Sequence, residues 1–180
     1  MIIALAGLPG TGKSYLAHAL AKAHPMIILD KDQIRAHLFP GEYTVYTRQQ
    51  DDLCVNIMLQ VSAFHLQMDP SRIIILDGRP FLKTYQVDHV INAAQKMKTP
   101  LYWIECTASD ETIKHRTIQD YGIHPAKNRT WEWYLSQKQE AEALTVPTLR
   151  IATDEEASEL AVARVLEYIR PSMLQAPRGE

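Results

Sequence analysis

The stretch that decides the fold is GLPGTGKS, Gly7 to Ser14, which directly follows the apolar run IIALA at Ile2–Ala6. It fits the pattern G-x-x-x-x-G-K-[S/T] at every fixed position, and a chance match in a chain of this length has a probability below about 1%. Glycines let the backbone wrap around phosphate groups, and the start of a helix adds a partial positive charge. The stretch therefore predicts a strand, a phosphate-binding loop and a helix. The predicted nucleotide-binding residues are Gly7, Leu8, Pro9, Gly10, Thr11, Gly12, Lys13, Ser14 and Tyr15.

Two side chains of this loop have specific predicted roles. Lys13 should reach the β- and γ-phosphates of a nucleoside triphosphate and act in catalysis, and the Ser14 hydroxyl should be a ligand of Mg²⁺. ATP and Mg²⁺ are accordingly the predicted co-substrate and metal ion.

Four further apolar runs have the composition of buried parallel strands, because they are rich in Ile and Leu and do not alternate with polar residues. They are Met26–Leu29, Arg72–Leu76, Leu101–Cys106 and Thr148–Ala152. Helical patterns separate them, which predicts a three-layer α/β fold, a five-stranded parallel sheet with helices on both faces. In such sheets ligands bind beyond the carboxyl ends of the strands, so the residues after each run are the candidates for a site.

The helical segments are predicted from apolar spacing and from caps. They are Ser14–Ala23, Arg48–Met68, Lys83–Lys98, a helix opened by Thr107 and Asp110, and Asp154–Ile169 with Thr153 and Glu156 as a capping box. The stripe of Arg48–Met68 expected to face the core is Leu53, Ile57, Val61, Phe64 and Met68.

Length and composition indicate one domain, residues 1–170, followed by a flexible tail at 171–180. The chain has 180 residues, 46% of them hydrophobic, and a net charge of −2, which argues against a general affinity for nucleic acid or anionic membrane. Two cysteines, Cys54 and Cys106, are too few for a disulfide framework and favour a reducing cytoplasm. No run is long enough to span a membrane, and the histidines lack metal-ligand spacing.

The segment DKDQIR, Asp30 to Arg35, follows the second predicted strand. A general base must reach the hydroxyl of an acceptor, and a nearby arginine can hold an anionic acceptor, so Asp32 and Arg35 are predicted for these roles. Either Asp30 or Asp32 could instead cap the helix that begins here. Which of the two aspartates is the base stays open at this stage.

Two later segments complete the predicted site. Asp77 ends the third strand and is a predicted partner of Mg²⁺, and Arg79 is a predicted substrate-binding residue or a surface arginine. Residues of about 109–135 are locally basic and predict a helical lid, in which Arg116 stabilises the transferring phosphoryl group. The lid aromatics Trp131, Trp133 and Tyr134 either stack on a ligand or pack the lid onto the core.

GLPGTGKS, DKDQIR, IIILDGRPF and the basic lid together resemble the small P-loop kinases over roughly Met1 to Ile169. The pattern is similar to predicted kinases of the AAA_33-like group, and to polynucleotide 5′-hydroxyl kinases, zeta-toxin-like and chloramphenicol phosphotransferase-like enzymes and adenylylsulfate kinases. The resemblance implies the P-loop NTPase fold with the P-loop strand central and the third strand beside it. It also implies that Asp32 is the base, Arg35 the substrate-holding arginine, Asp77 the acidic residue and Arg116 the first lid arginine.

Two departures from the family pattern bear on the substrate and the lid. Lys31 stands where adenylylsulfate kinases have glycine, which argues against that substrate. A second lid arginine would fall at Asp120, so either Arg129 or Lys127 acts instead or the lid is incomplete.

The expected function is ATP-dependent phosphoryl transfer to a hydroxyl of a small molecule, which can itself be anionic. The alternatives are a polynucleotide 5′-hydroxyl kinase and a regulatory NTPase without an acceptor, which would have no pocket beside the γ-phosphate. Acceptor specificity is expected from Phe39–Tyr46 and from the residues after Gly78. The sequence predicts neither the acceptor itself nor the oligomeric state.

Overall fold

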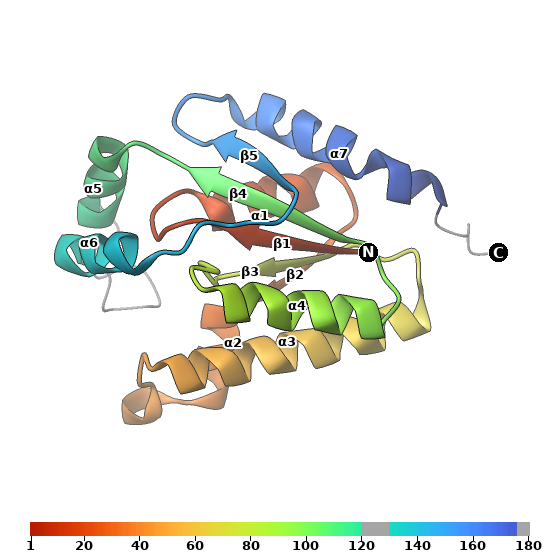
Figure 1. Ribbon diagram of the computed structural model, residues 1–180, viewed down its shortest axis with the longest axis horizontal. Coiled ribbons are helices and arrows are strands. Elements are labelled where there is room, and N and C mark those ends of the chain that lie inside the picture. The colour runs from red at the N-terminus through yellow and green to blue at the C-terminus, as the bar shows by residue number, and fades with distance from the viewer. Residues whose placement is uncertain (120–129, 176–180) are drawn as a thin grey trace.

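The computed structural model describes residues 1–119 and 130–175, and its centre is a five-stranded parallel sheet (Figure 1). The strands are β1 Ile2–Ala6, β2 Ile27–Asp30, β3 Ile74–Asp77, β4 Leu101–Thr107 and β5 Thr148–Ala152. They pair in the order β2-β3-β1-β4-β5, and all four pairings are parallel. The predicted fold class is confirmed, and so is the implied order with the P-loop strand central and the third strand beside it.

Helices cover both faces of this sheet (Figure 1). They are α1 Lys13–Ala23, α2 Lys31–Leu38, α3 Arg48–Met68, α4 Thr84–Lys96, α5 Asp110–Gln119, α6 Trp131–Glu140 and α7 Ser158–Gln175, with a 3₁₀ turn η1 at Gly41–Tyr43. Helices α1 and α7 contact each other on one face, and α3 and α4 lie on the other. Helices α5 and α6 contact each other at the end of the sheet where the strands terminate.

Strand β1 joins the two halves of the hydrophobic core because its side chains alternate between the faces. Ile3 and Leu5 pack with residues of α1 and α7, whereas Ile2 and Ala4 pack with residues of α3 and α4. All five residues of β1 are at most 2% exposed. An apolar strand buried on both faces holds the loop that follows it at a fixed place in the molecule.

The predicted core stripe of α3 is wrong. Leu53, Phe64 and Met68 are 46%, 62% and 65% exposed, and Ile57 and Val61 are only partly buried. The face that packs on the sheet consists of Cys54, Val55, Met58, Leu59, Ser62 and Leu66. Helix α3 carries apolar residues on two faces, and spacing alone does not distinguish the face that the sheet covers.

Two predicted helix starts also differ from the structure. Thr107 belongs to β4, and the residue that caps α5 is Ser109, whose Oγ accepts a hydrogen bond from the Thr112 N–H at 3.3 Å. Helix α7 begins at Ser158 rather than at Asp154, because Glu155 and Glu156 donate their N–H groups to the Ala152 carbonyl in a turn.

Helix α7 also extends beyond the predicted start of the tail at residue 171, continuing through Pro171 to Gln175. The Ser172 hydroxyl lies 2.7 Å from the Tyr102 hydroxyl, and Met173 packs against the core, so these contacts hold the last helical turn. The remainder of the predicted tail lies outside the described residues. Within residues 1–119 and 130–175, none of the helices combines the length and apolar character that crossing a membrane requires.

Candidate active site

The phosphate-binding loop lies between β1 and α1, and three of its glycines adopt positive φ angles, 124° at Gly7, 80° at Gly10 and 81° at Gly12. A Cβ at Gly7 would lie 2.2 Å from the Cys106 carbonyl oxygen, so this position accepts only glycine. Lys13 is 8% exposed, and its Nζ donates hydrogen bonds of 2.8 Å to the carbonyls of Gly7 and Leu8. The lysine therefore lies across its own loop.

A pocket of about 490 Å³ opens beside this loop on the side of β4 and β5. Its lining comes from the loop and the start of α1, from Gly78 after β3, from α5, and from the segment after β5 through the start of α7. The lining residues include Gly10, Gly12, Lys13, Ser14, Tyr15, Arg116, Thr153, Glu156 and Ser158. Its size and its position at the phosphate loop make it the candidate nucleotide pocket.

Arg116 connects α5 to this nucleotide pocket. Its Nη1 donates hydrogen bonds of 3.1 Å to the Gly10 carbonyl and to the Thr153 hydroxyl, and its Nη2 donates to the Thr153 carbonyl at 3.2 Å. The Thr153 hydroxyl in turn donates to the Thr11 carbonyl at 2.9 Å. The predicted lid arginine thus lies at the phosphate loop, with its guanidinium held by backbone oxygens.

Asp77 lies at the carboxyl end of β3, next to β1, and its side chain is fully buried. Burial raises the pKa of this carboxyl group, and the nearby Ser14 hydroxyl and Lys13 ammonium oppose that rise. In the described part of the chain, both carboxylate oxygens are buried without a hydrogen-bond partner of normal geometry. An unsatisfied carboxylate beside a hydroxyl is a set of hard oxygen donors, which suits Mg²⁺ when phosphates and water complete its coordination.

The Mg²⁺ site would need those phosphate oxygens. Among residues 1–119 and 130–175, no group of three or more His, Cys, Asp or Glu side chains is arranged to hold a metal ion. The chain thus offers Ser14 and Asp77, and a bound nucleotide would supply further ligands.

A second pocket of about 190 Å³ lies on the β2 and β3 side of the loop. It is lined by residues of α2, of the start of α3, of the segment after β3 and of α6. They include Lys31, Asp32, Arg35, Tyr46, Arg48, Asp51, Arg79, Lys83, Gln86, Trp133 and Glu140. Lys13 and Gly78 line both pockets, so the two meet where the terminal phosphate of a bound nucleotide would lie.

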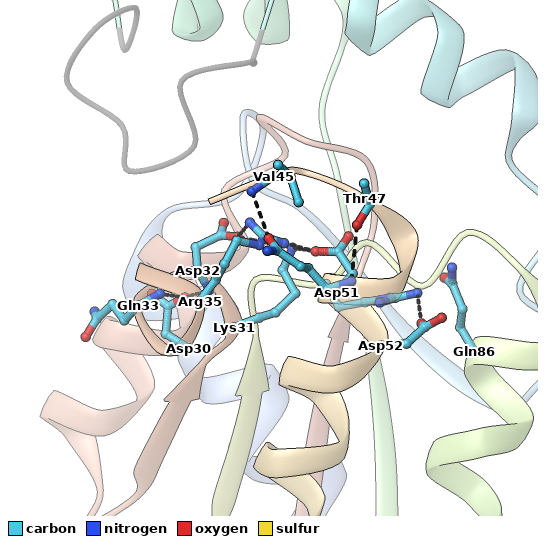
Figure 2. Close-up of polar contacts among 12 residues, drawn as sticks. Asp30, Lys31, Asp32, Gln33, Arg35, Val45, Thr47, Asp51, Asp52 and Gln86 are labelled. Carbon is cyan, nitrogen blue, oxygen red and sulfur yellow. Dashed lines mark hydrogen bonds and ion pairs between the residues drawn. The ribbon is translucent and has the colours of Figure 1, made fainter. Parts of the chain in front are cut away.

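Four charged side chains, Lys31, Asp32, Arg35 and Asp51, form an ionic cluster in the wall of this second pocket (Figure 2). Asp32 Oδ1 lies 2.8 Å from Arg35 Nη1 and 3.1 Å from Lys31 Nζ. Asp51 Oδ1 lies 2.9 Å from Lys31 Nζ and also pairs with Arg35 Nη2. Figure 2 shows the four side chains directed toward one another from α2 and α3. Burial lowers the pKa of Lys31 to about 8, and Asp32 opposes this effect.

The two aspartates that the sequence left open have different positions. Asp30 caps α2, because its Oδ1 accepts hydrogen bonds from the N–H groups of Asp32 at 2.8 Å and Gln33 at 3.3 Å. Asp32, in contrast, lines the second pocket. Arg79 also lines this pocket, where it is 3% exposed and its Nη2 donates a hydrogen bond of 2.6 Å to Asp52.

The lid segment contributes α5 and α6 on either side of residues that lie outside the described part, among them Asp120, Lys127 and Arg129. Tyr134 is buried, stacks on Trp131 with ring centroids 4.9 Å apart and donates its hydroxyl hydrogen to Asp110, so these aromatics pack the lid. Trp133 instead lines the second pocket. Packing is thus the role observed for Trp131 and Tyr134, and stacking of Trp133 on a ligand stays a prediction.

Sequence reasoning missed several residues of the second pocket, namely Lys31, Arg48, Asp51, Gln86 and Glu140. Of the predicted specificity segment Phe39–Tyr46, Tyr46 lines the pocket, and the segment after Gly78 contributes as expected. The signal available was the pair of aspartates near the start of α3, Asp51 and Asp52, because carboxylates near a helix start are candidates for a site.

Comparison with solved structures shows the same fold in several proteins. A kinase candidate from Chloroflexus aurantiacus superposes with a TM-score of 0.74 at 19% identity, covering 92% of this chain and 96% of that one. A sugar kinase from Janibacter sp. HTCC2649 gives a TM-score of 0.68 at 17% identity over 98% of both chains. Kti12 from Chaetomium thermophilum, in complex with ADP-AlF3, gives 0.67 at 14% identity over 96% and 99%.

No curated protein sequence matches the chain. A family model does match, since the AAA_33 model, described as an AAA domain, covers residues 2–140, which hold the phosphate loop, the ionic cluster, Asp77 and Arg116. The chain therefore belongs to the AAA_33 family, and its predicted kinship with the P-loop kinases of this group is confirmed.

Proposed function

We propose that the protein is an ATP-dependent kinase that transfers the γ-phosphoryl group to a hydroxyl group of a small molecule. The observation that carries this proposal is the pair of pockets that meet at Lys13 and Gly78. One has the phosphate loop in its wall, and the other contains a carboxylate, Asp32, among hydrogen-bonding side chains. A phosphotransferase needs such a donor site and acceptor site on opposite sides of the transferred group.

On the donor side, Lys13 and Arg116 stabilise the negative charge that develops on the transferring phosphoryl group. When phosphates bind, Lys13 Nζ exchanges its hydrogen bonds to the Gly7 and Leu8 carbonyls for hydrogen bonds to phosphate oxygens. Its positive charge then lies directly beside the phosphates. Ser14 and Asp77 would hold Mg²⁺, which supplies charge neutralisation at the phosphates when bound. The loop N–H groups and the start of α1 bind the remaining phosphate oxygens.

On the acceptor side, Asp32 accepts the proton of the attacking hydroxyl. Lys31 and Arg35 hold its carboxylate in one orientation through the contacts of the ionic cluster, so the base is positioned before the acceptor binds. Arg79 and the polar groups of the α6 wall orient the rest of the acceptor.

The regulatory NTPase alternative predicts no pocket beside the γ-phosphate, so the second pocket supports a kinase instead. A polynucleotide kinase would gain from a surplus of basic residues, whereas this chain has a net charge of −2. The sugar kinase among the structural neighbours supports a small-molecule acceptor. A cytoplasmic location belongs to the same proposal, and it rests on Cys54 and Cys106, both buried and free.

The test of this proposal is transfer of labelled phosphate from ATP to a panel of sugars, polyols, nucleosides and oligonucleotides, with wild type and Asp32→Asn. We expect Asp32→Asn to lower kcat by about 10²- to 10⁴-fold, the usual contribution of a general base, with little change in Mg-ATP affinity. Asp88→Asn, a matched change at an exposed position of α4, should behave as wild type. Transfer by Asp32→Asn at the wild-type rate would exclude the role of Asp32. Hydrolysis of ATP that no acceptor accelerates would favour the regulatory NTPase.

A further inference from the structure

The buried cations that α2 and the segment after β3 contribute to the acceptor pocket wall already have carboxylate partners. Lys31, Arg35 and Arg79 are 5%, 3% and 3% exposed, and each forms an ion pair within the protein. The sequence suggested Arg35 and Arg79 as groups that hold an anionic acceptor. Because these cations are already paired with carboxylates of the protein, an anionic acceptor would have to compete with those carboxylates.

Arg35 illustrates the difficulty for an anionic acceptor. Its Nη1 and Nη2 are engaged by Asp32 and Asp51, and its guanidinium lies over the Tyr46 ring, 5.2 Å from the ring centroid. A guanidinium binds carboxylate or phosphate best through two parallel N–H groups. Each Nη group already pairs with a carboxylate, and Nε, which has no hydrogen-bond partner among the described residues, is buried. An anion that approached Arg35 from the pocket would therefore compete with Asp32 and Asp51 for the guanidinium.

Asp51 is the residue that makes the ionic cluster neutral overall. Lys31 and Arg35 contribute two positive charges and Asp32 one negative charge, so the cluster would carry a net charge of +1 without Asp51. Asp51 comes from a different helix, α3, whose first turn holds it through the hydrogen bond from its N–H to the Thr47 carbonyl at 3.1 Å. Its side chain is 25% exposed and lines the pocket.

The cost of displacement distinguishes the two classes of acceptor. An anion that took the place of Asp51 would leave this carboxylate in a partly buried position without its counter-ions, which is strongly unfavourable. An uncharged hydroxyl group can donate to Asp51 or Asp32 and accept from Lys31 while the ion pairs stay intact. At the ionic cluster, where the four charges balance, hydroxyl groups are therefore favoured over carboxylate or phosphate groups.

We propose that Asp51 is a specificity-determining residue that adapts the pocket to an uncharged acceptor rich in hydroxyl groups, a sugar or polyol, and excludes its carboxylate and phosphate derivatives. This inference rests on the proposed kinase function, because it names the substrate class of the same pocket.

The experiment compares neutral acceptors with derivatives in which one group is replaced by a carboxylate or a phosphate. The series are glucose, gluconate and glucose 6-phosphate, and glycerol, glycerate and glycerol 3-phosphate. We expect wild type to prefer the neutral member of a series in kcat/KM, and Asp51→Asn to shift the ratio toward the anionic members by about tenfold or more. Asp51→Glu should keep the neutral preference, and Asp88→Asn is the surface control. A wild-type preference for anionic members, or an unchanged ratio in Asp51→Asn, would overturn the proposal.

A binding measurement separates this inference from the proposed function. Trp133 lines the same pocket, so its fluorescence reports occupancy, with Trp133→Phe to identify its signal. Sulfate and gluconate are titrated while Mg-ADP fills the phosphate loop. Gain of anion binding by Asp51→Asn over wild type supports the charge balance even where no acceptor is phosphorylated. Equal anion binding by both proteins counts against it, whatever the kinase assay shows.

Discussion

The burial of Lys31 makes the stability of the protein depend on pH in the alkaline range. Burial lowers the pKa of this ammonium group from its usual value of 10.5 to about 8. Between these values the unfolded chain retains a proton that the native protein has released. Stability contributed by this group therefore rises with pH in this window.

Replacing Lys31 by Met removes this dependence. The difference in unfolding free energy between wild type and Lys31→Met should grow in favour of wild type from about pH 8 to about pH 10.5, by at most on the order of 3 kcal/mol. Urea denaturation at several pH values across this window measures it. Lys22→Met, an exposed change on α1, should give a difference that is constant with pH. Parallel curves for wild type and Lys31→Met would contradict the prediction.

Single residues differed in how far the sequence could predict their place. Lys13 and Ser14 were predictable because their position depends on a short loop whose spacing is local. Asp51 and Trp133 reach the acceptor pocket from helices that begin far along the chain from Asp32, and only packing brings them there. The predicted location of Asp32 at the rim of the cleft is confirmed. It was predictable because Asp32 lies two residues after the end of β2, and in a parallel sheet the residues after the strand ends lie beside the ligand site.

At the scale of elements, the two faces of α3 differ in what a substitution costs. Met58 is fully buried against the sheet, so Met58→Ala should lower the unfolding free energy by about 2–5 kcal/mol. Leu53 is 46% exposed, and Leu53→Ala should change it by about 0.5 kcal/mol or less. Chemical denaturation of both variants measures the contrast. A larger loss of unfolding free energy for Leu53→Ala than for Met58→Ala would show that the Leu53 face, as the sequence predicted, is the one that packs on the core.

The strands were easier to predict than the faces and ends of helices. Each predicted strand overlaps an observed one, because a short run rich in Ile and Leu that lies between helical patterns is typical of a strand in a parallel sheet. The starts of α5 and α7 were misplaced because several polar residues near each start could cap it. Tertiary contacts decide among them, as with Asp154, which accepts a hydrogen bond from the Ser109 N–H at 2.8 Å across the site.

At the scale of the whole molecule, the nucleotide pocket and the acceptor pocket meet at Lys13 and Gly78 and otherwise draw their walls from different elements. Arg116 lies on the β4 and β5 side and Asp51 on the β2 side, so changes in the two should act independently. We expect Arg116→Met to weaken Mg-ATP binding by about tenfold, and to the same extent in wild type and in Asp51→Asn. Isothermal titration calorimetry of the two single variants and the double variant measures this. A double variant whose loss departs from that of Arg116→Met would show that the pockets are coupled.

The division of the pockets has a consequence for how such a protein diversifies. Much of the acceptor wall comes from one continuous stretch of chain, from Lys31 to Gln86, whereas the nucleotide wall comes largely from the first helix, from α5 and from the segment after β5. A single recombination event that exchanges this stretch and retains Asp77 and Gly78 would carry most of a new substrate preference into the chain. The inherited machinery for handling the nucleotide would pass through that event nearly unaltered.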